Sequence, residues 1–311
     1  MSLEEINSAS IGLPPEALPI DTPPEKPMQA RDWLQATGEI VLLFAFILPV
    51  WTVLGIVLIA PSLLLKKYSH EFSEANQKRI DQLYAFSTEI FTILTAIAKF
   101  PLAYLKPLEN VEKKDGRPIL LVHGYLHNSS GWTYFLKRLG EKQIGPIYTI
   151  DLGFPFLPLS VYAKRIEAKV KEIGRDDLIL VGHSMGGVVA SLYATKLAPE
   201  GKVTDVFTLA SPLSGSHLAS TLGIGPDGRE MRPEAAILAE VRSGMEAKKS
   251  SIRFHHAGSD ADLLVSAESA LSGCGRQLRV SDLGHVQFLS SDKIIDWIGD
   301  ELQSNDSSGK S

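Results

Sequence analysis

The fold is decided by residues 177–194, which read DLILVGHSMGGVVASLYA. In this stretch an apolar run ends at a turn of small residues, and a second apolar run with helical spacing follows. Gly182, Ser184 and Gly186 fit the pattern G-x-S-x-G between a predicted strand and a predicted helix. Such a turn strains the serine backbone, and glycine on either side lets the neighbouring chain pack close. The stretch predicts a nucleophilic Ser184 if a base and an acid lie elsewhere in the chain.

Two later segments offer that base and acid. His285 lies in SDLGHVQFL, just after the last predicted strand, where a loop at the carboxyl edge of the sheet carries it to the serine. The loop before that strand, HAGSDADLLVSAESA, offers Asp260 and Asp262. We favour Asp262, because D-L-L-V-S is close to the D-x-x-V-P form common at this position, with Ser266 replacing the proline; Asp260 remains the alternative. The order Ser184, Asp262, His285 is the nucleophile, acid, base order of the α/β-hydrolases.

A developing oxyanion needs two backbone donors held in advance. The amide of Met185, directly after the nucleophile, is the first. The second is the amide of Tyr125 in LVHGYLHNSSGW, where His123 and Gly124 end an early strand. Glycine lets this loop approach the substrate carbonyl, while His123 is predicted to be a structural hydrogen-bonding residue.

The rest of the C-terminal part alternates short β-rich runs with amphipathic helical stretches. This alternation predicts an α/β fold with a mostly parallel sheet and helices on both faces. The predicted helices include 160–173 and 187–197, and the predicted strands are 118–124, 147–153, 178–184, 206–211, 252–258 and 278–284.

From residue 117 to residue 299 the chain resembles the lipase and esterase branch of the α/β-hydrolase superfamily. The resemblance is carried, in order, by VHGY, GHSMGG, LASPLSGS and GH. The stretch TLASPLSGS (208–216) is also similar to a signature of bacterial lipases and of deacylases that act on glycosylphosphatidylinositol. The resemblance implies an α/β-hydrolase fold and a cofactor-free serine hydrolase. Ser211, where threonine is usual, and the lack of room for a large cap domain depart from that pattern.

An apolar segment precedes this body. Residues 40–65 contain no ionisable side chain, and as a helix they would extend roughly 39 Å, more than the roughly 30 Å hydrocarbon core of a bilayer. We expect a membrane helix, single-pass or re-entrant, with Pro49 and Pro61 as possible kinks. Lys66, Lys67 and Arg79 follow it closely, which favours a cytoplasmic catalytic domain.

These features divide the chain into five predicted parts. They are a disordered proline-rich arm (1–38), a transmembrane or re-entrant anchor (39–66), an amphipathic helical connector (67–114), an α/β-hydrolase domain (115–301) and a disordered tail (302–311).

Composition narrows the function classes. The net charge of −5 with scattered basic residues argues against nucleic acid as a partner. A single cysteine and the lack of H-E-x-x-H spacing argue against a metal site, and no cofactor is expected. We predict a membrane-anchored hydrolase of carboxylic esters, with lipid or other apolar acyl esters as substrates. An acyltransferase or thioesterase with the same triad, and a non-catalytic membrane interaction protein, remain alternatives.

Overall fold

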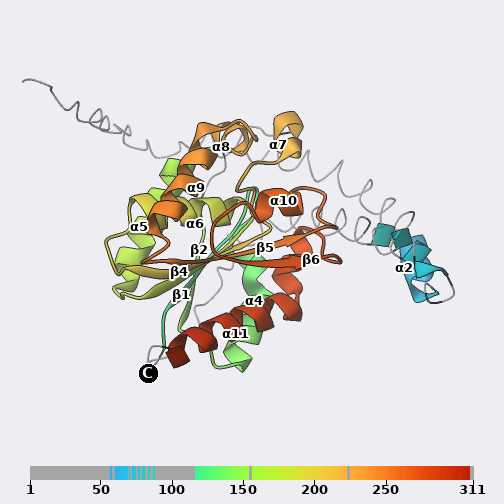
Figure 1. Ribbon diagram of the computed structural model, residues 1–311, viewed down its shortest axis with the longest axis horizontal. Coiled ribbons are helices and arrows are strands. Elements are labelled where there is room, and N and C mark those ends of the chain that lie inside the picture. Colours follow the sequence, from blue (N-terminus) through green and yellow to red (C-terminus); the bar gives the residue numbers. More distant parts are fainter. Residues whose placement is uncertain are drawn as a thin grey trace, which may run out of the picture. The chain divides into compact units, whose positions relative to one another are not determined.

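Six short apolar runs form a parallel sheet with the strand order β2-β1-β3-β4-β5-β6 (Figure 1). Helices cover both faces of such a sheet, so its inner strands are apolar throughout rather than alternating. β1 reads ILLV and β3 reads LILVGH, and both are buried at every position. All six predicted strands are present, as β1 (Ile119–Val122), β2 (Ile147–Ile150), β3 (Leu178–His183), β4 (Val203–Leu209), β5 (Arg253–Ser259) and β6 (Arg276–Val280).

Two layers of helices enclose this sheet (Figure 1). One layer consists of α5 (Leu159–Ile173), α6 (Met185–Lys196) and α9 (Ala236–Lys248), and the other of α4 (Thr133–Glu141) and α11 (Asp292–Ser308). Successive strand residues point to opposite faces. Leu120 and Leu180 therefore pack beneath the first layer, and Leu121 and Val181 beneath the second. The predicted α/β-hydrolase architecture is confirmed.

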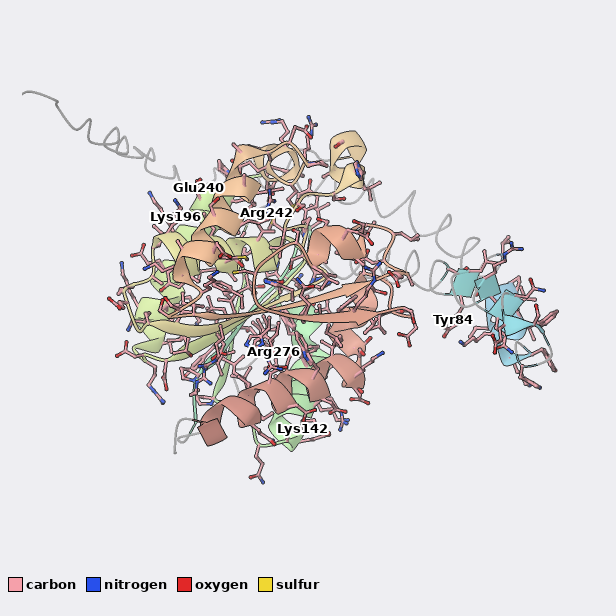
Figure 2. The ribbon with its side chains drawn as sticks, viewed as in Figure 1. Tyr84, Lys142, Lys196, Glu240, Arg242 and Arg276 are labelled. Carbon is pink, nitrogen blue, oxygen red and sulfur yellow. The ribbon has the colours of Figure 1, made fainter. Side chains whose placement is uncertain are left out.

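The helix that follows Ser184 has no polar face. Residues 185–195 of α6 are all buried, because α6 packs between the strands β3 and β4 and the helices α5 and α9. A helix that is apolar on all sides is expected in a protein interior. Polar contact begins at its end, where Lys196 Nζ lies 2.7 Å from Glu240 Oε1 of α9 (Figure 2). This enclosed helix fixes the position of Ser184.

Short elements follow the carboxyl ends of four of the strands. They are η3 (Ser129–Trp132), α7 (His217–Leu222), α8 (Gly225–Glu230), α10 (Ala267–Ala270) and η4 (Val286–Ser290). Ligands of open α/β sheets bind at this edge, so these elements belong to the neighbourhood of Ser184.

The structure, a computed structural model, describes residues 116–153, 156–222 and 225–308, and shorter stretches between residues 57 and 87. The predicted arm at 1–38 lies outside them, as do most of the anchor at 39–66 and most of the connector at 67–114. The end of the anchor is described as the helix α2 (Ala60–Lys67). None of the helices in these described ranges has the length and apolar character needed to cross a membrane.

The C-terminal helix corrects one expectation. A disordered tail was predicted from residue 302, but α11 continues to Ser308. The physical reason is that Leu302, which lies within α11, is still buried in the core. Once a helix is anchored by such packing, each further residue costs little to add.

Candidate active site

Ser184 lies on a strained turn between β3 and α6. Its φ of 55° and ψ of −129° fall in a region that residues other than glycine rarely occupy. The Ser184 amide donates a hydrogen bond to the Leu209 carbonyl, with an N–O distance of 2.9 Å, which ties the turn to the end of β4. A strained residue held by its surroundings is common at functional sites.

The glycines on either side of the serine are required by close packing. A Cβ atom on Gly182 would lie 2.4 Å from the Cα atom of Gly187, and one on Gly186 would lie 2.3 Å from the Val122 carbonyl oxygen. Both distances are far shorter than real contacts of a Cβ atom. The turn therefore packs against both its own helix and β1, as the G-x-S-x-G pattern predicts.

The structure brings His285 and Asp262 together. His285 Nδ1 lies 2.8 Å from Asp262 Oδ2, and both side chains are buried. The other carboxylate oxygen, Oδ1, accepts hydrogen bonds from the amides of Leu264 (2.8 Å) and Val265 (2.9 Å). A carboxylate at Nδ1 fixes a proton on that nitrogen and leaves Nε2 as the basic atom.

Asp260 faces a different partner. Its Oδ1 lies 2.6 Å from Arg279 Nη2, and this ion pair is largely exposed to solvent. Of the two aspartates that the sequence offered, Asp262 contacts the histidine and Asp260 contacts an arginine.

His183, the residue before the serine, holds the histidine loop in place. Its Nε2 lies 2.9 Å from the carbonyl oxygen of His285, to which it donates. The two imidazole rings lie 4.7 Å apart between centroids. Burial, and next the proximity of His285, lower the pKa of His183 well below its usual value. His183 is therefore a neutral donor that brings His285 beside the serine turn.

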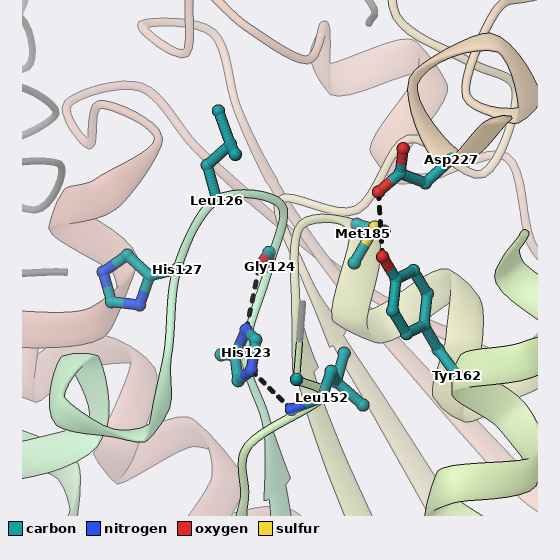
Figure 3. A pocket seen from close by; sticks show the side chains of 9 residues that line it. His123, Gly124, Leu126, His127, Leu152, Tyr162, Met185 and Asp227 are labelled. Carbon is teal, nitrogen blue, oxygen red and sulfur yellow. Dashed lines mark hydrogen bonds between the residues drawn. The ribbon is translucent and has the colours of Figure 1, made fainter. Parts of the chain in front are cut away.

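His123 is likewise a neutral, structural histidine. Its Nδ1 donates to the Gly124 carbonyl and its Nε2 accepts from the Leu152 amide, both at 2.9 Å (Figure 3). Burial lowers the pKa of His123 to about 4. With both ring nitrogens engaged by the backbone, His123 joins the end of β1 to the end of β2, as the sequence predicts.

The predicted oxyanion loop lies directly against Ser184. A Cβ atom on Gly124 would lie 2.9 Å from the Cβ atom of Ser184 and 3.1 Å from the His183 carbonyl oxygen. Tyr125 follows Gly124, and its ring packs edge-on against Phe156 with centroids 6.3 Å apart. Met185 is the first residue of α6, where helix amides point away from the helix and are free to bind an anion.

A small pocket opens beside this loop (Figure 3). Gly124 and Leu126 lie on one side of it, and Met185, Tyr162 and Asp227 on the other. The full lining is His123, Gly124, Leu126, His127, Leu152, Gly153, Tyr162, Met185 and Asp227. Sequence reasoning did not find Asp227 or Tyr162, because Asp227 lies in GPDG, which resembles an ordinary turn, and Tyr162 in an amphipathic helix.

The serine-rich loop after β4 supports the acid loop. Ser216 Oγ donates to the Leu264 carbonyl, and Ser269 Oγ donates to the Gly215 carbonyl at 2.6 Å. The Ser214 amide donates in turn to Ser269 Oγ at 3.1 Å. These bonds join residues 214–216 to the segment that follows Asp262. Throughout the described ranges, no group of three or more His, Cys, Asp or Glu side chains is arranged to hold a metal ion.

Comparisons with known proteins find an esterase of similar sequence and solved structures that align with this chain. An esterase from Nocardioides sp. strain SG-4G, named for carbendazim hydrolysis, is 28% identical over 113 residues, which are 33% of this chain and 46% of the esterase. A lipase from Bacillus licheniformis in its mature form aligns over 58% of this chain and 91% of its own, with 18% identity and a TM-score of 0.50. A Burkholderia cenocepacia protein described as a putative aryl esterase aligns over 64% of this chain and 94% of its own, with 18% identity and a TM-score of 0.47.

The likeness to the lipase concerns the fold, and the match to the Nocardioides esterase spans less than half of that protein. A broader match comes from the sequence model of the alpha/beta hydrolase family, which covers residues 119–292. That range runs from β1 to the start of α11 and includes Ser184, Asp262 and His285. The chain belongs to the alpha/beta hydrolase family.

Proposed function

We propose that this chain is a membrane-anchored serine hydrolase that cleaves carboxylic esters. The observation that carries the proposal is the 2.8 Å contact between His285 and Asp262 at the sheet edge that presents Ser184. A serine hydroxyl is a weak nucleophile at neutral pH, and a histidine oriented by a carboxylate activates it.

The reaction follows from these positions. Nε2 of His285 takes the proton of Ser184 Oγ while that oxygen attacks the ester carbonyl. The amides of Tyr125 and Met185 donate hydrogen bonds to the oxyanion that forms. The C–O bond to the alcohol then breaks, the alcohol leaves with the proton held by His285, and an acyl-serine remains. Water, deprotonated by the same histidine, hydrolyses it and restores the enzyme.

Asp262 keeps this histidine in the productive form. It accepts from Nδ1 and stabilises the imidazolium that appears during the reaction. Its second oxygen is held by two backbone amides, so the carboxylate cannot rotate away without losing both bonds.

The apolar segment at residues 40–65 supports a membrane location and an apolar substrate. Its length and lack of charge suit a bilayer span or a re-entrant turn, and the basic residues after it favour a cytoplasmic catalytic domain. A catalytic domain held beside a bilayer meets lipid esters at a raised effective concentration. We therefore propose lipid or other apolar acyl esters as the substrate class.

The substitution Ser184→Ala tests the catalytic proposal. We expect it to abolish the hydrolysis of short acyl esters and labelling by a fluorophosphonate probe, because the probe reacts with the activated serine alone. Circular dichroism should show an unchanged fold. Labelling that persists in Ser184→Ala, or a folded wild-type protein that is never labelled, would contradict the assignment.

A further inference from the structure

The ring of His123 contacts two backbone groups, and these contacts fix which ring nitrogen carries the proton. The Leu152 amide can only donate, so Nε2 of His123, which lies 2.9 Å from it, carries no proton. In a neutral imidazole the proton then lies on Nδ1, which donates to the Gly124 carbonyl at 2.9 Å (Figure 3). Because burial lowers the pKa of His123 to about 4, this neutral tautomer is present at neutral pH.

The Gly124 carbonyl belongs to the same peptide unit as the Tyr125 amide, one of the two proposed oxyanion donors. This peptide bond is trans, and in a planar trans peptide the carbonyl and the N–H group point in opposite directions. The hydrogen bond from His123 to the Gly124 oxygen therefore sets the direction of the Tyr125 N–H group, which points away from His123. Tyr125 lies in a turn outside the helices and strands, so this contact does what a regular element would otherwise do.

The other proposed donor, the Met185 amide, is oriented by the backbone. It shares a peptide unit with the Ser184 carbonyl, which accepts a hydrogen bond from the Gly187 amide at 3.0 Å. The first turn of α6 thus holds this peptide unit in place. The direction of one donor is set by the backbone of a helix, and that of the other by the side chain of His123.

The hydrogen bonds around His123 also run in one direction. The Leu152 amide donates to the ring, and the ring donates to the Gly124 carbonyl. The next donor in this chain is the N–H group of the same peptide unit, that of Tyr125. Hydrogen bonds in such a chain polarise one another, which strengthens the last donor. A donor that is held in place before the reaction needs no rearrangement when negative charge develops.

We propose that His123 is a positioning residue that orients and polarises the Tyr125 amide for the oxyanion of the transition state. The bond from Nδ1 to the Gly124 carbonyl stabilises the transition state through that amide, and the bond from Leu152 to Nε2 fixes the tautomer. The inference rests on the proposed ester hydrolysis. It adds to that reaction a residue that lowers the barrier without touching the substrate.

Two substitutions separate the two contacts of the ring. The amide nitrogen of asparagine is bonded to Cγ, as Nδ1 of histidine is, so His123→Asn keeps a donor for the Gly124 carbonyl and loses the contact with Leu152. The amide group of glutamine lies one carbon further along the side chain. His123→Gln therefore keeps an acceptor for the Leu152 amide and loses the donor to Gly124.

His256→Gln is the matched control. His256 is another fully buried histidine, and burial lowers its pKa to about 4 as well. Its ring nitrogens lie 2.8 Å from Thr208 Oγ1 and 2.9 Å from the Cys274 carbonyl oxygen, and neither partner belongs to the proposed oxyanion site. We expect His256→Gln to lower the melting temperature without changing the rate per active site.

Two constants are measured for each protein, per active site counted by complete titration with a fluorophosphonate. The first is kcat/KM for p-nitrophenyl butanoate. The second is the Ki of propyl trifluoromethyl ketone, a transition-state analogue. Ser184 Oγ adds to its carbonyl carbon, the serine proton passes to His285, and the carbonyl oxygen becomes an oxyanion with no leaving group lost.

The proposal predicts that these two constants change together. We expect His123→Gln to lower kcat/KM about tenfold or more and to raise Ki by a similar factor. The loss should stay below the roughly 10²–10³-fold loss that follows removal of an oxyanion donor itself. His123→Asn should recover most of both constants.

Three results would overturn the inference. In the first, His123→Gln lowers only the melting temperature and keeps the wild-type kcat/KM and Ki, as the control does. In the second, His123→Asn loses as much kcat/KM as His123→Gln. If His123→Gln does not fold, His123→Asn decides: wild-type constants support the inference, and a tenfold loss, the third result, contradicts it. A folded wild type that neither hydrolyses the ester nor reacts with the fluorophosphonate would refute the proposed ester hydrolase, and this inference with it.

Discussion

Asp260 and Asp262 are two residues apart, yet the backbone turn sends their side chains in different directions. Asp262 is enclosed by His285 and two backbone amides, whereas Asp260 reaches the exposed Arg279. The sequence favoured Asp262 through its similarity to the D-x-x-V-P form but kept Asp260 as an alternative, because two carboxylates in one loop are chemically equivalent until the loop is folded. The contacts, rather than the residue type, therefore support Asp262 as the orienting acid of the proposed triad.

Exchanging each carboxylate for its amide tests this assignment. Asp262→Asn should lower kcat on the order of 10⁴-fold, because an amide favours the wrong tautomer of His285. Asp260→Asn should leave kcat nearly unchanged, since an exposed ion pair contributes about 0–1 kcal/mol to stability. Steady-state kinetics with one short acyl ester measures both. The reverse ranking would make Asp260 the orienting acid.

Between elements, a buried charged cluster ties strands together away from the serine turn. Asp205 of β4 accepts from Arg253 of β5 at 2.8 and 2.7 Å, from Arg117 before β1, and lies 3.2 Å from His255 Nε2. The ring of His255 stacks on Phe207 with centroids 4.2 Å apart. Burial alone would raise the pKa of Asp205, but the hydrogen bonds from His255 and Arg253 and the charge of Arg117 outweigh it, so the pKa is lowered.

The lowered pKa of Asp205 predicts how the stability lost in the substitution Asp205→Asn changes with pH. The folded state favours the charged carboxylate, so its stabilisation is present above the unfolded pKa of about 3.9 and is lost as the pH falls through the lower folded value. At pH 7 we expect Asp205→Asn to lower the free energy of unfolding by about 3–5 kcal/mol, because the guanidinium groups lose their partner. Urea denaturation at pH 7 and near pH 3 measures this loss, which should shrink at the lower pH. A constant or growing difference would refute the charge argument.

At the scale of the whole molecule, the features that could be predicted from the sequence are those that short stretches of sequence determine. The six strands follow from short apolar runs, and the turn at Ser184 follows from glycines whose missing side chains the packing requires. Asp227 was not found because its partners, Phe156 and Tyr162, lie 71 and 65 residues away in the chain. Such a contact depends on how α8 meets α5 after folding, and no local pattern records it.

The proposed membrane anchor at residues 39–66 determines where the whole chain is expected to be found. In carbonate extraction of membranes, we expect the full chain to remain with the lipid fraction and a version lacking residues 1–66 to be released. Fluorophosphonate labelling of Ser184 in the shortened version checks that its catalytic domain is folded. Recovery of the full chain in the soluble fraction would refute the proposed anchor.

The enclosure of α6 affects how mutational surveys of this protein should be interpreted. Residues 185–195 are buried on every side. Most substitutions there will therefore lower the free energy of unfolding, typically by about 0.5–3 kcal/mol each, and so reduce the amount of folded protein. A screen scored by total activity would rank these positions beside Ser184 and His285. Normalising turnover to the number of correctly folded molecules would separate the residues of the proposed triad from those that only support the turn at Ser184.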